Sequence, residues 1–176
     1  MKPAFYVVSE RKLTWLFCLT LGMYTFYWHY KNWKNYTQAG PDGPPPGDAM
    51  LPVGRAIFPV FFTHALFRIV KAHAAEHLRP LVWRNDRHAT LLVFLTVLTG
   101  VLARQQDRGV DVWILASLWI VSLLPLLLCH RTAQSFINAS CGDAGGSGND
   151  RFTWANYLWM AAGIALWGYV VRSLLN

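Results

Sequence analysis

Charged residues are scarce in this chain of 176 residues: 14% are Asp, Glu, Lys or Arg, against about 25% in a typical soluble protein. By contrast, 54% of the residues are hydrophobic and 15% are aromatic, and the mean hydropathy is positive. A soluble domain of this size would lack the polar groups needed to cover its surface. The apolar content also excludes an intrinsically disordered chain. The composition therefore indicates an integral membrane protein.

Cysteine is also scarce, with three residues at widely separated positions. An odd number without paired spacing excludes a disulfide framework and a cysteine-based zinc site. Cys18 and Cys129 lie in apolar runs, where a thiol behaves as a small hydrophobic group.

Asp, Glu, Lys and Arg are absent from the interior of four long apolar stretches. Each stretch is close to the lower limit of about 17 residues for a transmembrane helix. A signal peptide is the rival interpretation of the first, but its far end carries large aromatic residues instead of the small residues of a cleavage site. The predicted fold is all-α, an integral membrane bundle of four transmembrane helices. The predicted spans cover about residues 13–30, 89–103, 112–129 and 154–171.

A fifth apolar run, residues 56–67, is too short for a regular span. It continues into a segment where charged and apolar residues alternate, as on the two faces of an amphipathic helix. We therefore predict an interfacial or re-entrant helix over about residues 56–79, within a single membrane domain formed by residues 1–176. Flexible loops are predicted at residues 39–48, which are rich in Pro and Gly, and at residues 142–150, which contain four glycines.

Basic residues outnumber acidic ones by 16 to 9, which gives a net charge of +7. In a soluble protein this balance would suggest nucleic-acid binding. In a membrane protein, basic residues collect in cytoplasmic loops and face anionic headgroups, so we predict no nucleic-acid partner. With four spans, the positive-inside rule places residues 31–88 and 130–151 in the cytoplasm. If residues 56–67 also cross, the rule instead places the N-terminus inside, so charge leaves the orientation open.

The basic residues of segment 55–88 are the predicted contacts with lipid headgroups or with a partner protein. Small residues at four-residue spacing in the spans favour close helix packing, within the chain or in a homo-oligomer. The predicted contact residues are Arg68, Lys71, Arg79, Arg84 and Arg87.

The sharpest local motif is His73-Ala-Ala-Glu76-His77, which matches the His-x-x-Glu-His pattern of some zinc peptidases. On a helix the two histidines lie one turn apart and could bind one metal ion, with Glu76 as general base. Such enzymes take a third ligand, usually a glutamate, and Glu10 is the only other one in the chain. A solvated helix face explains the motif more simply, so we predict no metal, cofactor or catalytic residue and keep a membrane metalloenzyme as an alternative. The aspartates that could replace the missing glutamate are Asp86 and Asp107.

Ion-coupled transporters usually place ionisable residues inside the membrane. Because the four spans contain none, secondary transport is disfavoured. A small oligomeric channel or transport subunit remains as a third hypothesis.

The sequence from Thr20 to Lys31 reads Thr-Leu-Gly-x-Tyr-x-x-Tyr-Trp-x-Tyr-Lys. It resembles the first span of small bacterial inner-membrane proteins of unknown function, and residues 55–64 and 152–167 resemble their second segment and last span. The resemblance implies a multi-pass protein of the bacterial inner membrane and supplies no activity or catalytic residue. We therefore expect a non-enzymatic accessory or interaction component with a basic cytoplasmic segment.

Overall fold

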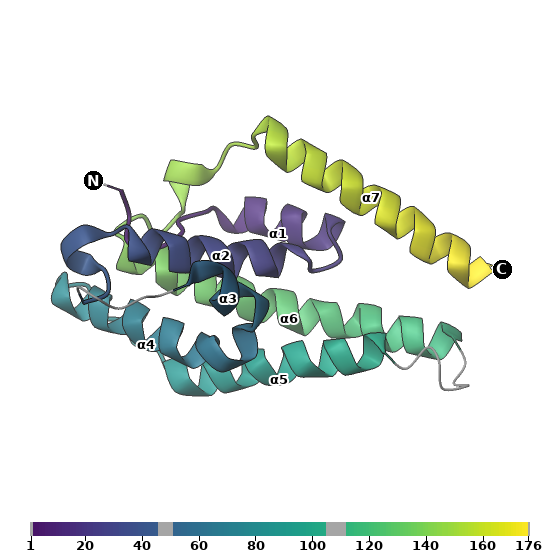
Figure 1. Cartoon of the computed structure of the whole chain (residues 1–176), viewed down its shortest axis with the longest axis horizontal. Coiled ribbons are helices and arrows are strands. Elements are labelled where there is room, and N and C mark those ends of the chain that lie inside the picture. Colours follow the sequence, from purple (N-terminus) through teal and green to yellow (C-terminus); the bar gives the residue numbers. More distant parts are fainter. Residues whose placement is uncertain (1, 46–50, 105–111, 176) are drawn as a thin grey trace.

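The computed structural model describes residues 2–45, 51–104 and 112–175. Over these residues the chain is helical and contains no β-strand, which confirms the predicted all-α class. Figure 1 shows the elements: α1 (Glu10–Leu19), α2 (Tyr24–Thr37), η1 (Gly40–Asp42), α3 (Pro52–Ile57), α4 (Pro59–Glu76), α5 (Asn85–Ala103), α6 (Val112–Ser140), η3 (Ser147–Asn149) and α7 (Trp154–Leu175).

The first predicted span, residues 13–30, is two helices instead of one, so this prediction is corrected. α1 ends at Leu19, and the next residues include two with left-handed backbone angles, Leu21 (φ 53°) and Gly22 (φ 80°). The Gly22 amide donates to the Phe17 carbonyl at 2.9 Å, a hydrogen bond that closes the helix end. The chain then reverses, and α2 runs back along α1 as a helical hairpin (Figure 1).

The side chain of Thr20 fixes this reversal. Its Oγ1 donates to the Leu16 carbonyl at 2.7 Å and accepts from the Tyr24 amide at 3.0 Å. One hydroxyl thus ends α1 and begins α2. With 10 and 14 residues, the two helices rise about 15 and 21 Å at 1.5 Å per residue. Neither alone matches the roughly 30 Å of a bilayer core.

An extended segment, residues 4–9, is buried between α2, the C-terminal part of α6 and the loop that follows α6. Phe5 and Val8 are completely buried, so the backbone groups around them need partners inside the protein. Asn138 of α6 supplies two of these partners. Its Oδ1 accepts from the Val8 amide at 3.3 Å, and its Nδ2 donates to the Val8 carbonyl at 2.9 Å.

The backbone of Tyr6 is likewise hydrogen-bonded to amide side chains from two helices. The Tyr6 amide donates to Asn32 Oδ1 of α2 at 3.1 Å, and Gln134 Nε2 of α6 donates to the Tyr6 carbonyl at 2.9 Å. Gln134 Oε1 also accepts from the buried Trp28 indole at 2.6 Å. Because Tyr6 precedes α1 and contacts the far half of α2, this network is consistent only with a reversed chain.

The loop at residues 142–150, which we predicted to be flexible, is packed against the extended segment. Asn149 Nδ2 donates to the Val7 carbonyl at 2.9 Å. Gly146 has a φ of +66°, and a Cβ there would collide with the Val8 carbonyl. Gly146 therefore permits a close approach of the two backbones. Of the other predicted loop, residues 39–45 contain η1, while residues 46–48 lie outside the described part.

The predicted interfacial helix over residues 56–79 is also divided, into α3 and α4, which meet at Phe58. The inner side of α4 is completely buried at Leu66, Phe67 and Val70. Its apolar stripe therefore contributes to the protein core, and α4 packs mainly against α5 and α6. The exposed large hydrophobic side chains of this region lie near the two ends of α4: Ile57, Phe58, Phe61 and Leu78.

Two of the described helices, α5 and residues 116–140 of α6, are long and apolar enough to cross a membrane. Only 17% and 39% of the residues in their most apolar windows are buried in the protein. A core helix of a soluble protein would be mostly buried. Two of the described helices pass this test, so the predicted bundle of four transmembrane helices is not confirmed. The fourth predicted span, residues 154–171, falls on α7.

α7 contacts the rest of the molecule mainly through α1. The Trp167 indole donates to the Cys18 carbonyl at 3.0 Å, and a Cβ on Gly163 would collide with the Leu19 carbonyl. Gly163 therefore permits the two backbones to touch.

Replacing Asn138 by Leu should destabilise the protein by about 2–4 kcal/mol, because the buried amide and carbonyl of Val8 both lose their partner. The matched control is Thr132→Ala on the same helix, which removes an exposed hydroxyl bonded to Leu128 and should have little effect. Thermal unfolding of the purified protein in detergent measures both. Equal stability of the two variants would contradict the role of Asn138.

Replacing Gly163 by Ala should lower the stability by about 1–3 kcal/mol, because the added methyl forces α7 away from α1. Gly168→Ala is the matched control, since a Cβ there meets nothing within 4 Å and alanine favours the helix. Crosslinking between cysteines introduced in α1 and α7 reports the separation. The packing is refuted if both variants crosslink like the parent chain.

Candidate metal centre

A short turn after α2 presents Asp42. The sequence Gly40-Pro41-Asp42-Gly43 has proline at the second position and glycine at the fourth, as in a type I turn. Gly40 has a φ of +64°, and the Gly43 amide donates to the Gly40 carbonyl at 3.0 Å. A Cβ on Gly43 would lie 2.9 Å from the carbonyl oxygen of Tyr36, so the turn folds tightly onto the end of α2.

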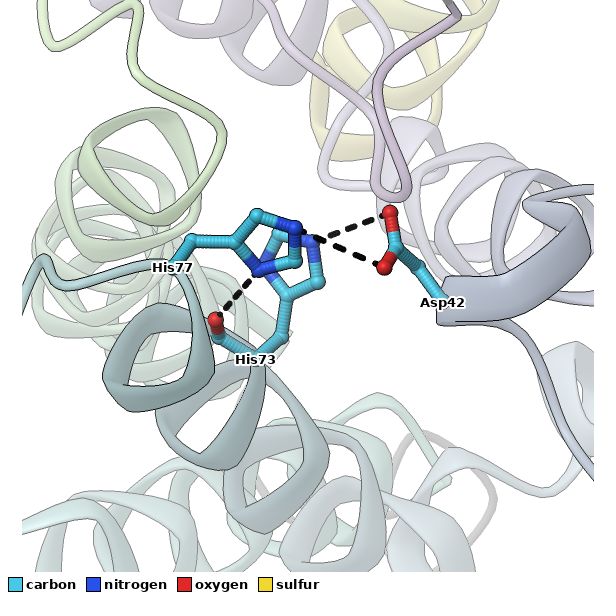
Figure 2. Close-up of side chains that lie close together, drawn as sticks. All are labelled: Asp42, His73 and His77. Carbon is cyan, nitrogen blue, oxygen red and sulfur yellow. Dashed lines mark hydrogen bonds and ion pairs between the residues drawn. The ribbon is translucent and has the colours of Figure 1, made fainter.

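His73 and His77 come from the end of α4, one helical turn apart, and both imidazoles face the Asp42 carboxylate (Figure 2). His77 Nε2 lies 3.4 Å from Asp42 Oδ1, and His73 Nε2 lies 3.9 Å from Oδ2. The two ring centroids are 4.2 Å apart. One ligand atom from each residue lies within 4.8 Å of the others, which makes this group a candidate metal centre.

The two imidazoles differ in their surroundings. His77 is exposed, and its Nδ1 lies 2.9 Å from the His73 carbonyl oxygen. His73 is buried, and its Nδ1 has no hydrogen-bond partner among the described residues. The ring of Phe5 meets His73 edge-on at 5.4 Å, so the extended segment forms one wall of the site.

Burial lowers the pKa of His73 from its ordinary value of 6.5, because the surroundings disfavour the charged imidazolium. The neighbouring His77 lowers the pKa further, whereas the carboxylates of Asp42 and Glu76 raise it by smaller amounts. His73 is therefore neutral at pH 7. A neutral imidazole is the form that ligates metal ions.

A cavity of about 590 Å³ adjoins the site. Lys31 and Arg79 contribute positive charge to its walls, and Cys141 and Asp143 also line it. Arg79 is held in place, since its Nη1 donates to the Ser140 carbonyl at 3.2 Å. The cavity therefore carries cationic groups beside the candidate ligands.

The predicted His-x-x-Glu-His motif is only partly brought together. His73 and His77 converge, but Glu76 is exposed on α4 and is not among the residues that line the cavity. The carboxylate that faces the imidazoles is Asp42, which the sequence reasoning did not select. Of the aspartates considered there, Asp86 accepts from Asn85 at the start of α5, and Asp107 lies outside the described residues.

The predicted headgroup or partner contacts divide into two groups. Lys71 turns inward, where its Nζ donates to the Trp83 carbonyl at 2.9 Å, and Arg79 borders the cavity. The other three remain exposed on the surface: Arg68, Arg84 and Arg87.

Comparison of the chain with protein-family models, with curated proteins and with solved structures gives no match. The functional assignment therefore depends on the residues themselves.

In metal-free protein, the pKa of His73 should lie below its ordinary value, and neighbouring charges should move it in opposite directions. His77→Gln removes the imidazole that lowers the pKa of His73 and should raise this pKa, while Glu76→Gln removes a carboxylate that raises it and should lower it. A pH titration of the imidazole resonances by NMR, with chelator present, measures both shifts. Shifts of the same sign would contradict this arrangement.

Proposed function

We propose that the chain is a multi-pass helical protein of the bacterial inner membrane, with α5, α6 and α7 as its crossings. The α1–α2 hairpin and the α3–α4 pair enter from the polar side without crossing. The single observation that carries this topology is the distribution of Lys and Arg. Thirteen of the 16 lie before residue 88 or within residues 130–151, and three, Arg104, Arg108 and Arg172, lie on the opposite side.

The positive-inside rule then assigns the thirteen basic residues to the cytoplasm. If residues 13–30 crossed as well, the same residues would divide ten to six, a weaker bias. The helical hairpin thus agrees with the charge distribution better than the four-span arrangement does.

The exposed apolar side chains support the same three crossings. They cover the outer faces of α5, α6 and α7, which extend toward one end of the molecule in Figure 1. An apolar surface of this extent on a monomer requires a lipid or protein cover. Its large members include Phe94, Val97, Val101, Ile114, Leu118, Val121, Leu124, Leu158, Ile164 and Leu166.

We propose a non-enzymatic accessory or interaction role for this protein. The absence of Asp, Glu, Lys and Arg from the predicted spans disfavours ion-coupled transport. The exposed Arg68, Arg84 and Arg87 provide positive charge for anionic headgroups or an acidic partner surface. The resemblance of the segment from Thr20 to Lys31 to small bacterial inner-membrane proteins supports the same location.

Single cysteines introduced into a cysteine-free variant test the topology by labelling in intact cells. Positions 3, 50, 85 and 147 should be protected from a membrane-impermeant reagent, while positions 108 and 176 should be labelled. The comparison of positions 3 and 50 is decisive, because they lie on the same side only if residues 13–30 form a hairpin. Labelling of one and not the other would restore the predicted first span.

A further inference from the structure

We propose that Asp42, His73 and His77 bind one divalent transition-metal ion of the zinc class, with an open coordination position toward the adjoining cavity. The proposed membrane topology and accessory role require no metal ion, so this inference goes beyond them. It rests on the geometry of three side chains from two separate elements.

The distances suit a tetrahedral ion. Zinc lies about 2.0–2.2 Å from imidazole nitrogen and carboxylate oxygen, so neighbouring ligand atoms in a tetrahedron are about 3.4 Å apart. His77 Nε2 and Asp42 Oδ1 have this separation, 3.4 Å. His73 Nε2 lies 3.9 Å from Oδ2, about 0.5 Å more than the tetrahedral separation, and the three ligand atoms lie within 4.8 Å of one another.

The surroundings orient the ligands as in known metal sites. A ligating histidine usually donates its second ring N–H to a carbonyl or carboxylate, and His77 Nδ1 has the His73 carbonyl oxygen at 2.9 Å. His73 is 7% exposed and makes no hydrogen bond at Nδ1. His73 would ligate through Nε2, the ring nitrogen that faces Asp42, and packing that includes the edge-on ring of Phe5 holds this imidazole in place.

The site is also rigid on both sides. The two histidines are fixed by one helix, and Asp42 is fixed by a turn whose glycines admit no side chain at Gly43. A preformed site loses less conformational entropy when the ion binds.

Three protein ligands leave the fourth position of a tetrahedral ion open. The cavity of about 590 Å³ adjoins this position, and Lys31 and Arg79 line it. Water or a small anion would complete the coordination there. This arrangement differs from a structural zinc site, in which the protein supplies all four ligands.

Metal binding to the full chain tests the proposal. The protein is purified in detergent without a histidine tag, stripped with chelator and titrated with Co²⁺, then with competing Zn²⁺. We expect one ion per chain and the visible absorption of four-coordinate cobalt. Asp42→Asn and His77→Gln should each weaken binding at least tenfold. The matched controls are Glu76→Gln in the same motif and His64→Gln earlier on the same helix, which should bind like the parent chain.

Two results would overturn the proposal: no stoichiometric ion in the parent chain, or equal binding by the parent and Asp42→Asn. A loss of binding in Glu76→Gln that matches the loss in Asp42→Asn would also overturn it, because the ligand set would then be different. Thermal unfolding with chelator checks that each variant is folded. If His77→Gln fails this check, Asp42→Asn decides the outcome, since Asp42 is partly exposed and lies in a turn.

Discussion

The arrangement of this molecule depends on satisfying the backbone of one buried, extended segment. Residues 4–9 lie among helices, and no strand in the described part of the chain pairs with their amides and carbonyls. Amide side chains take the place of a strand, because each offers a donor and an acceptor on one rigid group. Asn32 comes from α2, Asn138 from α6 and Asn149 from the following loop. These three elements are therefore fixed relative to one another by the segment they surround.

That constraint explains why the aromatic-rich stretch after α1 returns toward the N-terminus. Asn32 can reach Tyr6 only if α2 runs antiparallel to α1, and Thr20 and Gly22 provide the reversal. The conspicuous Thr-Leu-Gly-x-Tyr sequence is thus a turn with a side-chain cap. Its later members serve the same core: Tyr24 bonds the Tyr6 hydroxyl at 3.0 Å, and Trp28 bonds Gln134.

The sequence was sufficient for the helical class and for the apolar helices α5 and α6, because composition and uninterrupted hydrophobic length are local properties. It was insufficient for the hairpin. Residues 13–30 contain no Asp, Glu, Lys or Arg, and their composition does not reveal the contacts that reverse the chain, those of Thr20 with Tyr24 and of Tyr6 with Asn32. The packing of the loop at residues 142–150 could not be predicted for a related reason, since glycine permits either mobility or close backbone contact. The deciding neighbour, Val8, is more than 130 residues away.

The sequence predicted only part of the candidate metal centre. Helical periodicity places His73 and His77 on one face, but no local rule brings Asp42 to them across more than 30 residues. The residues around Asp42 predicted a turn, but nothing in the sequence predicted the contact of Asp42 with α4. Glu76 was considered because it belongs to the His-x-x-Glu-His motif, but its side chain is exposed on α4.

The buried segment also imposes an order of assembly. Residues 4–9 are synthesised well before Gln134, Asn138 and Asn149, on which their backbone depends. The segment therefore has no native partners on α6 until that helix has been made. A chain that stops before α6 is complete carries a segment with unmet hydrogen bonds.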